Sequence, residues 1–167
     1  MPLTGVVLDS VANLFSRPSL TADLVTQAVL GSGLTIKESR VSWYYVELPD
    51  RYHGWIEARN VRVYAEGQAA YASSGRIAQV TSLIAFLYHQ PAVSLRLPAL
   101  QATLGCRLEM IEDAGDWIRV ALPAGPSRWL KRGDVEIAEA GASRVRGSVE
   151  DVIALAQRFL GLPYLWG

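Results

Sequence analysis

The sequence predicts an all-β protein made of two tandem small barrels, followed by one C-terminal α-helix. Three observations predict this fold class. A block of 32 residues that begins at Leu30 returns without a gap at Leu104, 74 positions later; short alternating runs are separated by turn signals; and helical periodicity is confined to the tail. A period this long is typical of tandem domains with separate cores, because the repeats of stacked solenoids are shorter.

Ten positions are identical between the two copies of the block, and Ile36/Met110 and Ile56/Leu130 are conservative pairs. The identical pairs are Leu30/Leu104, Gly31/Gly105, Leu34/Leu108, Glu38/Glu112, Trp43/Trp117, Val46/Val120, Leu48/Leu122, Pro49/Pro123, Trp55/Trp129 and Val61/Val135. Residues that both copies keep are expected to serve the fold, whereas residues of one copy alone are candidates for function. The four tryptophans suit a ligand-stacking platform, but their presence in both copies favours core and barrel-closure roles.

The first unit is predicted over residues 1–66. Branched and aromatic residues alternate in 34–36 and 43–48, which is typical of strands. The turn signals that separate the strands are Arg17-Pro18-Ser19, Gly31-Ser32-Gly33, Pro49-Asp50 and Gly54. Several short strands without helix-length periodicity indicate a small barrel or sandwich.

A linker rich in Ala, Ser and Gly is predicted over 67–77, and the second unit over 78–138. A second linker, 139–147, leads to the tail at 148–167. Units of about 60 residues bury only about 60% of their unfolded surface and are marginal alone. The two units are therefore expected to pack against each other or against a third partner.

The tail is predicted to begin with a helix. Ser148 is a suitable N-cap, and Glu150 and Asp151 place acids in the first turn. The apolar stripe at helical spacing comprises Val149, Val152, Ile153, Ala156, Phe159 and Leu160. Gly161 is expected to stop the helix and Pro163 to prevent its continuation. The stripe requires a partner surface, because a helix of this length is not stable by itself in water.

Composition excludes several function classes. Lysine and arginine together number 16, as do aspartate and glutamate, so the net charge gives no reason to expect nucleic acid or an anionic membrane as partner. The apolar runs are too short to span a bilayer. The first residues lack the regions of a signal peptide, which predicts a cytoplasmic protein if Met1 is the native start. One cysteine cannot form an internal disulfide.

The single thiol and the two histidines are expected to be structural. Cys106 corresponds to Ser32 of the first copy and has no histidine near it in sequence, so a buried cysteine is favoured over a nucleophile. His89 ends an apolar run, and by the same 74-residue offset its counterpart is Phe15. No grouping of histidine, cysteine and acids has metal-ligand spacing, and no cofactor is expected.

Differences between the copies mark a candidate contact surface on the first unit. Tyr44, Tyr45, Tyr52, His53 and Gly54 are replaced in the second copy by Ile118, Arg119, Pro126, Ser127 and Arg128. Tyrosine offers a flat apolar face and a hydroxyl, which suits contact with peptide or sugar. Neutral divergence between the copies explains the same differences, so both explanations stay open.

Two parts of the chain resemble known families. Val11-Ala12-Asn13-Leu14, the run 24–31, Trp43-Tyr44-Tyr45-Val46 and Tyr52-His53-Gly54-Trp55-Ile56 resemble the bacterial SH3 (SH3b) domain. The tail 154–167, which ends in Pro163-Tyr164-Leu165-Trp166-Gly167, is similar to the opening of the NlpC/P60 cysteine peptidase domain. Two SH3b units before an NlpC/P60 domain is the layout of γ-D-glutamyl-L-diamino-acid endopeptidases, which recycle cell-wall peptides.

The resemblance implies two SH3-like barrels and a helix that begins an α+β peptidase domain. The catalytic Asp-Cys motif of that family and its histidines would lie beyond Gly167, so no catalytic residue is expected within this chain. A thiol needs a base or a helix N-terminus to become a nucleophilic thiolate. The chain by itself is therefore expected not to hydrolyse peptides, and its missing partner is the NlpC/P60 catalytic domain.

The resemblance also implies three substrate-binding residues. In these endopeptidases an acid and a tyrosine of the first SH3b unit hold the free amino end of L-Ala-γ-D-Glu peptides; Asp23, where glutamate is usual, and Tyr52 are the matching positions. Tyr164 matches a tyrosine that lines the groove from the catalytic side. The expected partner is a murein peptide with a free N-terminal L-Ala.

Two further functions remain as alternatives: a stand-alone, non-catalytic module that binds cell-wall peptide or glycan, and recognition of proline-rich peptides. The second alternative is disfavoured because the segment 18–23 has no run of acids.

Overall fold

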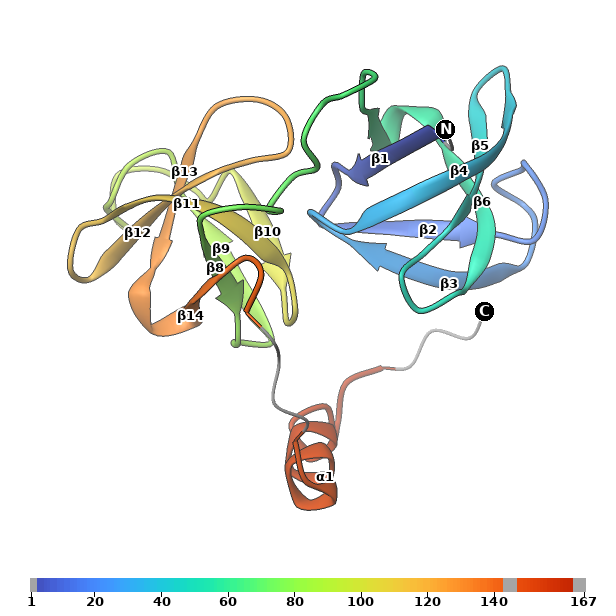
Figure 1. The fold of residues 1–167 in the computed structure, drawn as a ribbon. Helices are drawn as coiled ribbons and strands as arrows, with labels where there is room; N and C mark the ends of the chain where they lie inside the picture. Colours follow the sequence, from blue (N-terminus) through green and yellow to red (C-terminus); the bar gives the residue numbers. More distant parts are fainter. Residues whose placement is uncertain (1–2, 143–146, 164–167) are drawn as a thin grey trace.

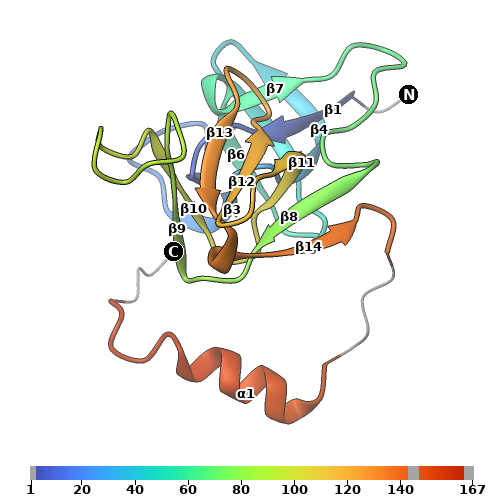
Figure 2. The same cartoon turned by 90° about the vertical axis from the view of Figure 1, so that its left-hand side faces the viewer.

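The computed structural model describes residues 3–142 and 147–163, which form two β units and one helix. The two units lie side by side, and α1 (Val149–Gln157) lies below them in the view of Figure 1. Figure 2, turned by 90°, again shows α1 set apart from the strands. The predicted all-β fold, two units followed by one helix, is confirmed.

The first unit is one antiparallel sheet in the order β3-β2-β6-β5-β4-β1-β7. Its elements are β1 (Leu3–Val7), β2 (Val11–Phe15), β3 (Leu24–Val29), β4 (Gly33–Arg40), β5 (Trp43–Glu47), β6 (His53–Glu57), the 3-10 turn η1 (Ala58–Asn60) and β7 (Val61–Val63).

The second unit has the same order of elements, divided between a five-stranded sheet, β13-β12-β11-β8-β14, and the pair β10-β9. Its elements are β8 (Arg76–Val80), β9 (Ile84–Leu87), β10 (Leu100–Thr103), β11 (Arg107–Asp113), β12 (Trp117–Ala121), β13 (Arg128–Lys131), the 3-10 turn η2 (Arg132–Asp134) and β14 (Val135–Glu139). Strand β8 thus begins inside the segment assigned to the linker, 67–77, and β14 ends at the first residue of the segment 139–147.

The two copies of the repeat have the same backbone arrangement, which we call the backbone frame. The register of β4 with β5 shifts between Ile36 and Glu38, and that of β11 with β12 shifts between Met110 and Glu112. The Leu-Gly turn is also shared, because Gly31 and Gly105 have φ angles of 81° and 87°. A residue without Cβ is favoured at such positive φ values, which explains why both copies keep glycine.

The offset between the two copies changes near their beginnings. Gly5 pairs with Leu34, whereas Ala78 pairs with Leu108, so the first strands of the units are 73 positions apart. Phe15 forms a bridge with Trp55, and the equivalent bridge joins Tyr88 to Trp129. The predicted match of His89 with Phe15 is therefore wrong: the counterpart of Phe15 is Tyr88, and His89 is exposed just after it.

Each unit has its own core of buried aliphatic side chains. In the first unit the cluster is Val7, Ala12, Leu14, Ala28, Leu34, Ile36, Val46, Leu48, Ile56 and Val61. In the second it is Ala78, Val80, Ala85, Leu87, Ala102, Cys106, Leu108, Ile118, Val120, Leu130 and Val135, joined by Leu30 of the first unit. The two units therefore pack against each other, as expected for units of this size.

The connector between the units is part of this packing. The Tyr71 hydroxyl donates to Ala121 O at 2.6 Å and accepts from Glu109 N at 3.2 Å. Ala72 N donates to the Glu109 carboxylate at 2.8 Å. Tyr71 and Ala72 also join a buried cluster with Val6, Tyr64 and Ile77. This buried bonding fixes the connector between the two units.

The four repeated tryptophans lie outside these cores. Val46 and Ile56 point into the first core, so Trp43 and Trp55, at alternate positions of the same strands, face outward. Trp117 and Trp129 face outward in the same way beside Ile118 and Leu130. Trp55 is nonetheless buried, with 6% of its surface exposed, as the predicted core role requires, whereas Trp43, Trp117 and Trp129 are only partly buried. The Phe15–Trp55 and Tyr88–Trp129 bridges place one tryptophan of each unit at a strand pairing, and the closure role stays a prediction.

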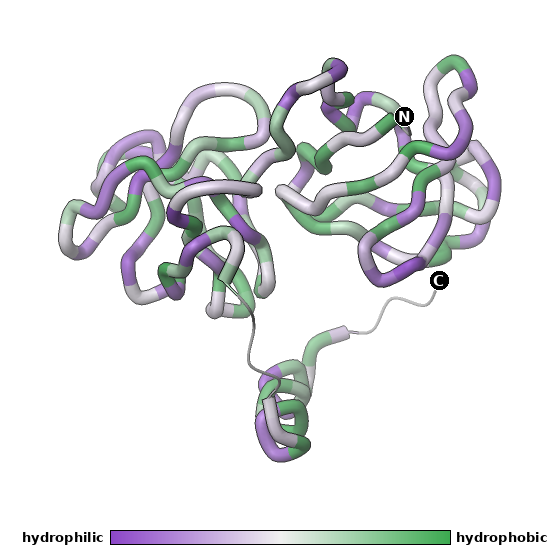
Figure 3. The backbone as a smooth tube through the Cα atoms, viewed as in Figure 1, coloured by the Kyte–Doolittle hydropathy of each residue, from purple (hydrophilic) through white to green (hydrophobic). Residues whose placement is uncertain are grey.

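Helix α1 begins as predicted, with Ser148 and Asp151 forming a capping box. It ends at Gln157, earlier than the predicted stop at Gly161, which follows with a φ of 86°. None of its residues is buried, and Figure 3 shows hydrophobic residues along it. Within the part of the chain that the structure describes, no helix is long and apolar enough to cross a membrane.

Candidate functional site

The hairpin between β5 and β6 presents Tyr52 to solvent. Its side chain is 56% exposed, and its backbone N donates to the Asp50 carboxylate at 3.1 Å. Leu48 N donates to Tyr52 O at 2.9 Å, and Arg51 adopts a positive φ of 71° between them. The loop is therefore held by its own bonds, and the Tyr52 ring and hydroxyl are available for contact.

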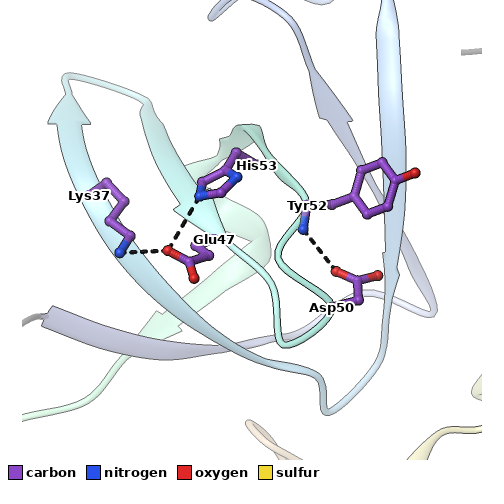
Figure 4. Close-up of polar contacts among 5 residues, drawn as sticks. All are labelled: Lys37, Glu47, Asp50, Tyr52 and His53. Carbon is purple, nitrogen blue, oxygen red and sulfur yellow. Dashed lines mark hydrogen bonds and ion pairs between the residues drawn. The ribbon is translucent and has the colours of Figure 1, made fainter.

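An ionic cluster lies on the other side of this hairpin (Figure 4). The Glu47 carboxylate contacts Lys37 Nζ at 2.6 Å and His53 Nε2 at 3.3 Å. The hydrogen bond from Lys37 is the main cause that lowers the pKa of Glu47 below its usual value of 4.5. Tyr45 stacks on His53, with ring centroids 6.2 Å apart. The charge of Glu47 is thus already paired with that of Lys37.

Asp23 ends the loop that joins β2 to β3. Its carbonyl accepts from Ser16 N at 2.9 Å, which closes the loop, and its side chain is exposed. The carboxylate has no hydrogen bond or ion pair with any residue in 3–142 or 147–163. An exposed acid without an internal cation can pair with the ammonium group of a ligand.

Strand pairing brings Asp23 and Tyr52 to the same end of the first unit. Strands β2 and β6 are antiparallel and meet at the Phe15–Trp55 bridge. The chain that leaves β2 therefore lies at the end where Tyr52 enters β6. Tyr164, the third predicted residue, lies outside the residues that the structure describes.

Three residues of this surface were not singled out from the sequence. Lys37, Glu47 and Asp50 fix the charges and the hairpin around Tyr52. The repeat could have identified them as residues of the first copy alone, because the second copy has Ile111, Ala121 and Ala124 at the same positions. The pairing of Lys37 with Glu47 follows only from the register of β4 with β5.

Cys106 has no catalytic environment. Its thiol is buried, burial raises its pKa, and its near neighbour is Thr103 Oγ1 at 3.8 Å. A thiol in such surroundings stays protonated and unreactive. The described ranges 3–142 and 147–163 also hold no group of three or more His, Cys, Asp and Glu residues that could bind a metal.

The comparisons with known proteins agree with this fold. The family described as bacterial dipeptidyl-peptidase Sh3 domain matches residues 14–61, and the YKFC SH3b2 domain matches residues 80–137. A crystal structure of an NlpC/P60 family protein from Bacillus cereus ATCC 10987 superposes with a TM-score of 0.80 at 23% identity, covering 98% of this chain and 65% of that one.

A curated relative is similar over most of the chain. The γ-D-glutamyl-L-lysine dipeptidyl-peptidase of Bacillus cereus (strain ATCC 10987 / NRS 248) is 27% identical over 151 residues. These residues are 86% of this chain but 44% of the relative, so the chain spans less than half of that protein. The two units are therefore SH3b-type domains, and the chain that carries them is homologous to a γ-D-glutamyl-L-lysine dipeptidyl-peptidase.

Proposed function

We propose that the two SH3b units position murein peptides for an NlpC/P60 cysteine peptidase domain that cleaves the bond between γ-D-Glu and the diamino acid. The first unit selects peptides with a free N-terminal L-Ala. The catalytic cysteine and histidines belong to the peptidase domain, and this chain contributes binding alone. The homology to a γ-D-glutamyl-L-lysine dipeptidyl-peptidase over 151 residues supports this function.

The observation that carries the proposal is a pair of exposed side chains, Asp23 and Tyr52, at one end of the first unit. Asp23 supplies an exposed carboxylate without a partner among the residues that the structure describes, and Tyr52 supplies an exposed ring and hydroxyl. A carboxylate pairs with the ammonium of an N-terminal residue, and a tyrosine packs against a small side chain such as that of alanine. Glu47 does not compete for the ammonium because it already forms an ion pair with Lys37 at 2.6 Å.

A blocked amino terminus tests this assignment. The chain joined to its peptidase domain is assayed with L-Ala-γ-D-Glu-L-Lys and with the N-acetylated form. The free peptide should be cleaved with the higher kcat/KM, and Asp23→Asn should reduce that preference by about fivefold, the effect of an exposed ion pair worth about 1 kcal/mol.

The matched control is Asp9→Asn, the same chemical change on an exposed acid in the loop before β2. That loop lies at the opposite end of β2 from Asp23, so this variant should keep the full preference. Equal cleavage of free and acetylated peptide by the unmodified protein would refute the assignment, as would equal effects of the two substitutions.

A second function is favoured because the buried clusters of the two β units do not depend on α1. The buried clusters of the described residues are built from the strands and the connector, and α1 contributes no buried residue. Such a pair of units can bind cell-wall peptide or glycan without a catalytic domain. Calorimetry of this 167-residue chain with murein fragments tests it; binding that depends on Tyr52 supports this reading, and no heat at millimolar ligand excludes it.

A further inference from the structure

The outer face of β12 and β13 carries two tryptophans and two cations in a checkerboard. Trp117 pairs across the strands with Lys131, and Arg119 pairs with Trp129. The intervening Ile118 and Leu130 are buried in the core, so these four side chains share the outward face. We refer to Trp117, Arg119, Trp129 and Lys131 as the cationic shelf.

The two cations of the shelf are positioned by the rings beside them. Lys131 Nζ lies 4.2 Å from the ring centroid of Trp117, and Arg119 Cζ lies 5.8 Å from that of Trp129. Arg119 Nε also donates to Ser127 Oγ at 3.0 Å. Cation–π contacts of this kind hold a charged group without neutralising it, so its other N–H donors remain free for a ligand.

The same four positions of the first unit carry the opposite charge. There the checkerboard is Trp43, Glu57, Tyr45 and Trp55, so its formal charge is −1, whereas the shelf carries +2. The tryptophans are common to both units and belong to the shared frame. The change is confined to the two positions between them, which become Arg119 and Lys131.

The two faces also differ in how far their charges are paired. In the first unit Glu57 contacts Arg59 at 2.8 Å, and Glu38 contacts Arg40 at 2.7 Å. In the second unit the carboxylate beside Arg119 is Glu112, at 3.8 Å. Lys131 forms no ion pair with any residue in the described ranges and is exposed. The shelf therefore has one positive charge, on Lys131, that no residue within 3–142 or 147–163 pairs with, and a second, on Arg119, that is paired only at 3.8 Å.

We propose that the cationic shelf binds a short peptide with free carboxylates. An Arg fork and a Lys ammonium suit carboxylates, and two partly exposed indoles suit the flat faces of peptide groups. A polyanion fits less well, because the shelf is bordered by Glu112, Asp113 and Asp116 and the whole chain has zero net charge. This inference rests on the proposed function and adds to it a second contact for murein peptides, which carry such carboxylates.

The test uses the whole 167-residue chain labelled with 15N and follows the indole N–H signals, assigned by single Trp→Phe variants. The probes are L-Ala-γ-D-Glu-L-Lys and the same peptide with its carboxylates amidated. The free peptide should shift the signals of Trp117 and Trp129 saturably, and the amidated peptide should not. The Trp43 signal should stay in place with both probes.

Two variants install the residues of the first unit on the shelf. Lys131→Glu and Arg119→Tyr should each weaken binding of the free peptide by at least about fivefold, the effect of losing one exposed ion pair. Lys131→Gln, which removes the charge without adding an acid, should weaken it by a similar factor. In the variants without added peptide, unchanged Trp43 and Trp55 indole signals show that the fold is intact.

Equal shifts with the amidated peptide, unchanged affinity of Lys131→Glu, or tighter binding of polyphosphate than of the peptide would overturn the inference. Tyr52→Ala separates it from the proposed function, because this change should leave the Trp117 and Trp129 shifts in place. If the free peptide does not shift the Trp117 and Trp129 signals but Asp23→Asn still reduces the preference for the free peptide, the proposed function stands and the inference about the shelf is refuted. The reverse outcome would keep the shelf and remove the role of Asp23.

Discussion

The Leu-Gly turn is identical in the two SH3b units, yet the units use it differently. Leu30 is 1% exposed and packs into the core of the second unit, whereas Leu104 is only partly buried. A Cβ added to Gly31 would lie 2.8 Å from Arg107 O, whereas one added to Gly105 would meet nothing within 4 Å. The first turn is an interface element, and the second is a turn at the surface.

This difference shows that identity between repeats has more than one cause. Gly31 and Gly105 both need a positive φ, so the backbone frame alone explains why both copies keep glycine. Burial against the neighbouring unit is an additional constraint that acts on the first copy only. Matched substitutions at the two positions therefore separate the frame from the interface.

The largest difference is expected for the leucines. Leu30→Ala removes a fully buried side chain from the core of the neighbouring unit and should lower the free energy of unfolding by about 3 kcal/mol. Leu104→Ala should cost about 1 kcal/mol because its side chain is already partly in contact with water. Urea unfolding followed by tryptophan fluorescence measures both. Equal losses would show that the Leu30 contact does not stabilise the pair of units.

The glycines should give a smaller difference of the same sign. Gly105→Ala meets only the strain of a left-handed backbone, about 1 kcal/mol or slightly more. Gly31→Ala adds a clash with Arg107 O and with the Tyr71 ring, at 2.8 and 3.1 Å, and should cost about 1–2 kcal/mol beyond that. The urea midpoints of the two variants provide the comparison. If Gly105→Ala were as unstable as Gly31→Ala, backbone strain alone would explain the loss, and the contacts with Arg107 and Tyr71 would contribute nothing.

The sequence predicted the frame well where the two copies align. Strands β5 and β12 lie 74 positions apart, as the ungapped block requires. The outward position of the tryptophans was also accessible, because Trp43 and the core residue Val46 are three positions apart and so lie on opposite faces of a strand. The 73-residue offset of the first strands was missed because it differs by one residue from that of the ungapped block, although 5–15 and 78–88 are identical at Val7/Val80, Ala12/Ala85 and Leu14/Leu87.

The candidate site and the interface depended on pairing that a sequence does not display. Asp23 and Tyr52 are 29 positions apart and come to one end of the unit only because β2 pairs with β6. Tyr71 lies in a segment rich in small residues, where a linker is the natural prediction. Its bonds to Glu109 and Ala121 form only when the connector packs against the folded second unit.

The smallest expected loss of stability is that of Tyr71→Phe, and this loss depends on pH. Tyr71→Phe leaves Ala121 O and Glu109 N without the hydroxyl that bonds to both, and should cost about 1 kcal/mol at pH 8. Tyr64→Phe is the matched control: the Tyr64 hydroxyl accepts from Tyr71 N at 2.7 Å within the first unit and the connector, so its loss should not loosen the contact between the units.

The pH dependence follows from burial, which is the main cause that raises the pKa of Tyr71 above its ordinary value of 10.0. Above pH 10 the unfolded chain loses this proton before the folded chain does, so the unfolded state is favoured and stability falls as pH rises. Tyr71→Phe lacks this proton. The gap in unfolding free energy between the parent and this variant should therefore shrink by about 1 kcal/mol between pH 8 and pH 11. A constant gap would mean that the hydroxyl between the units is open to water.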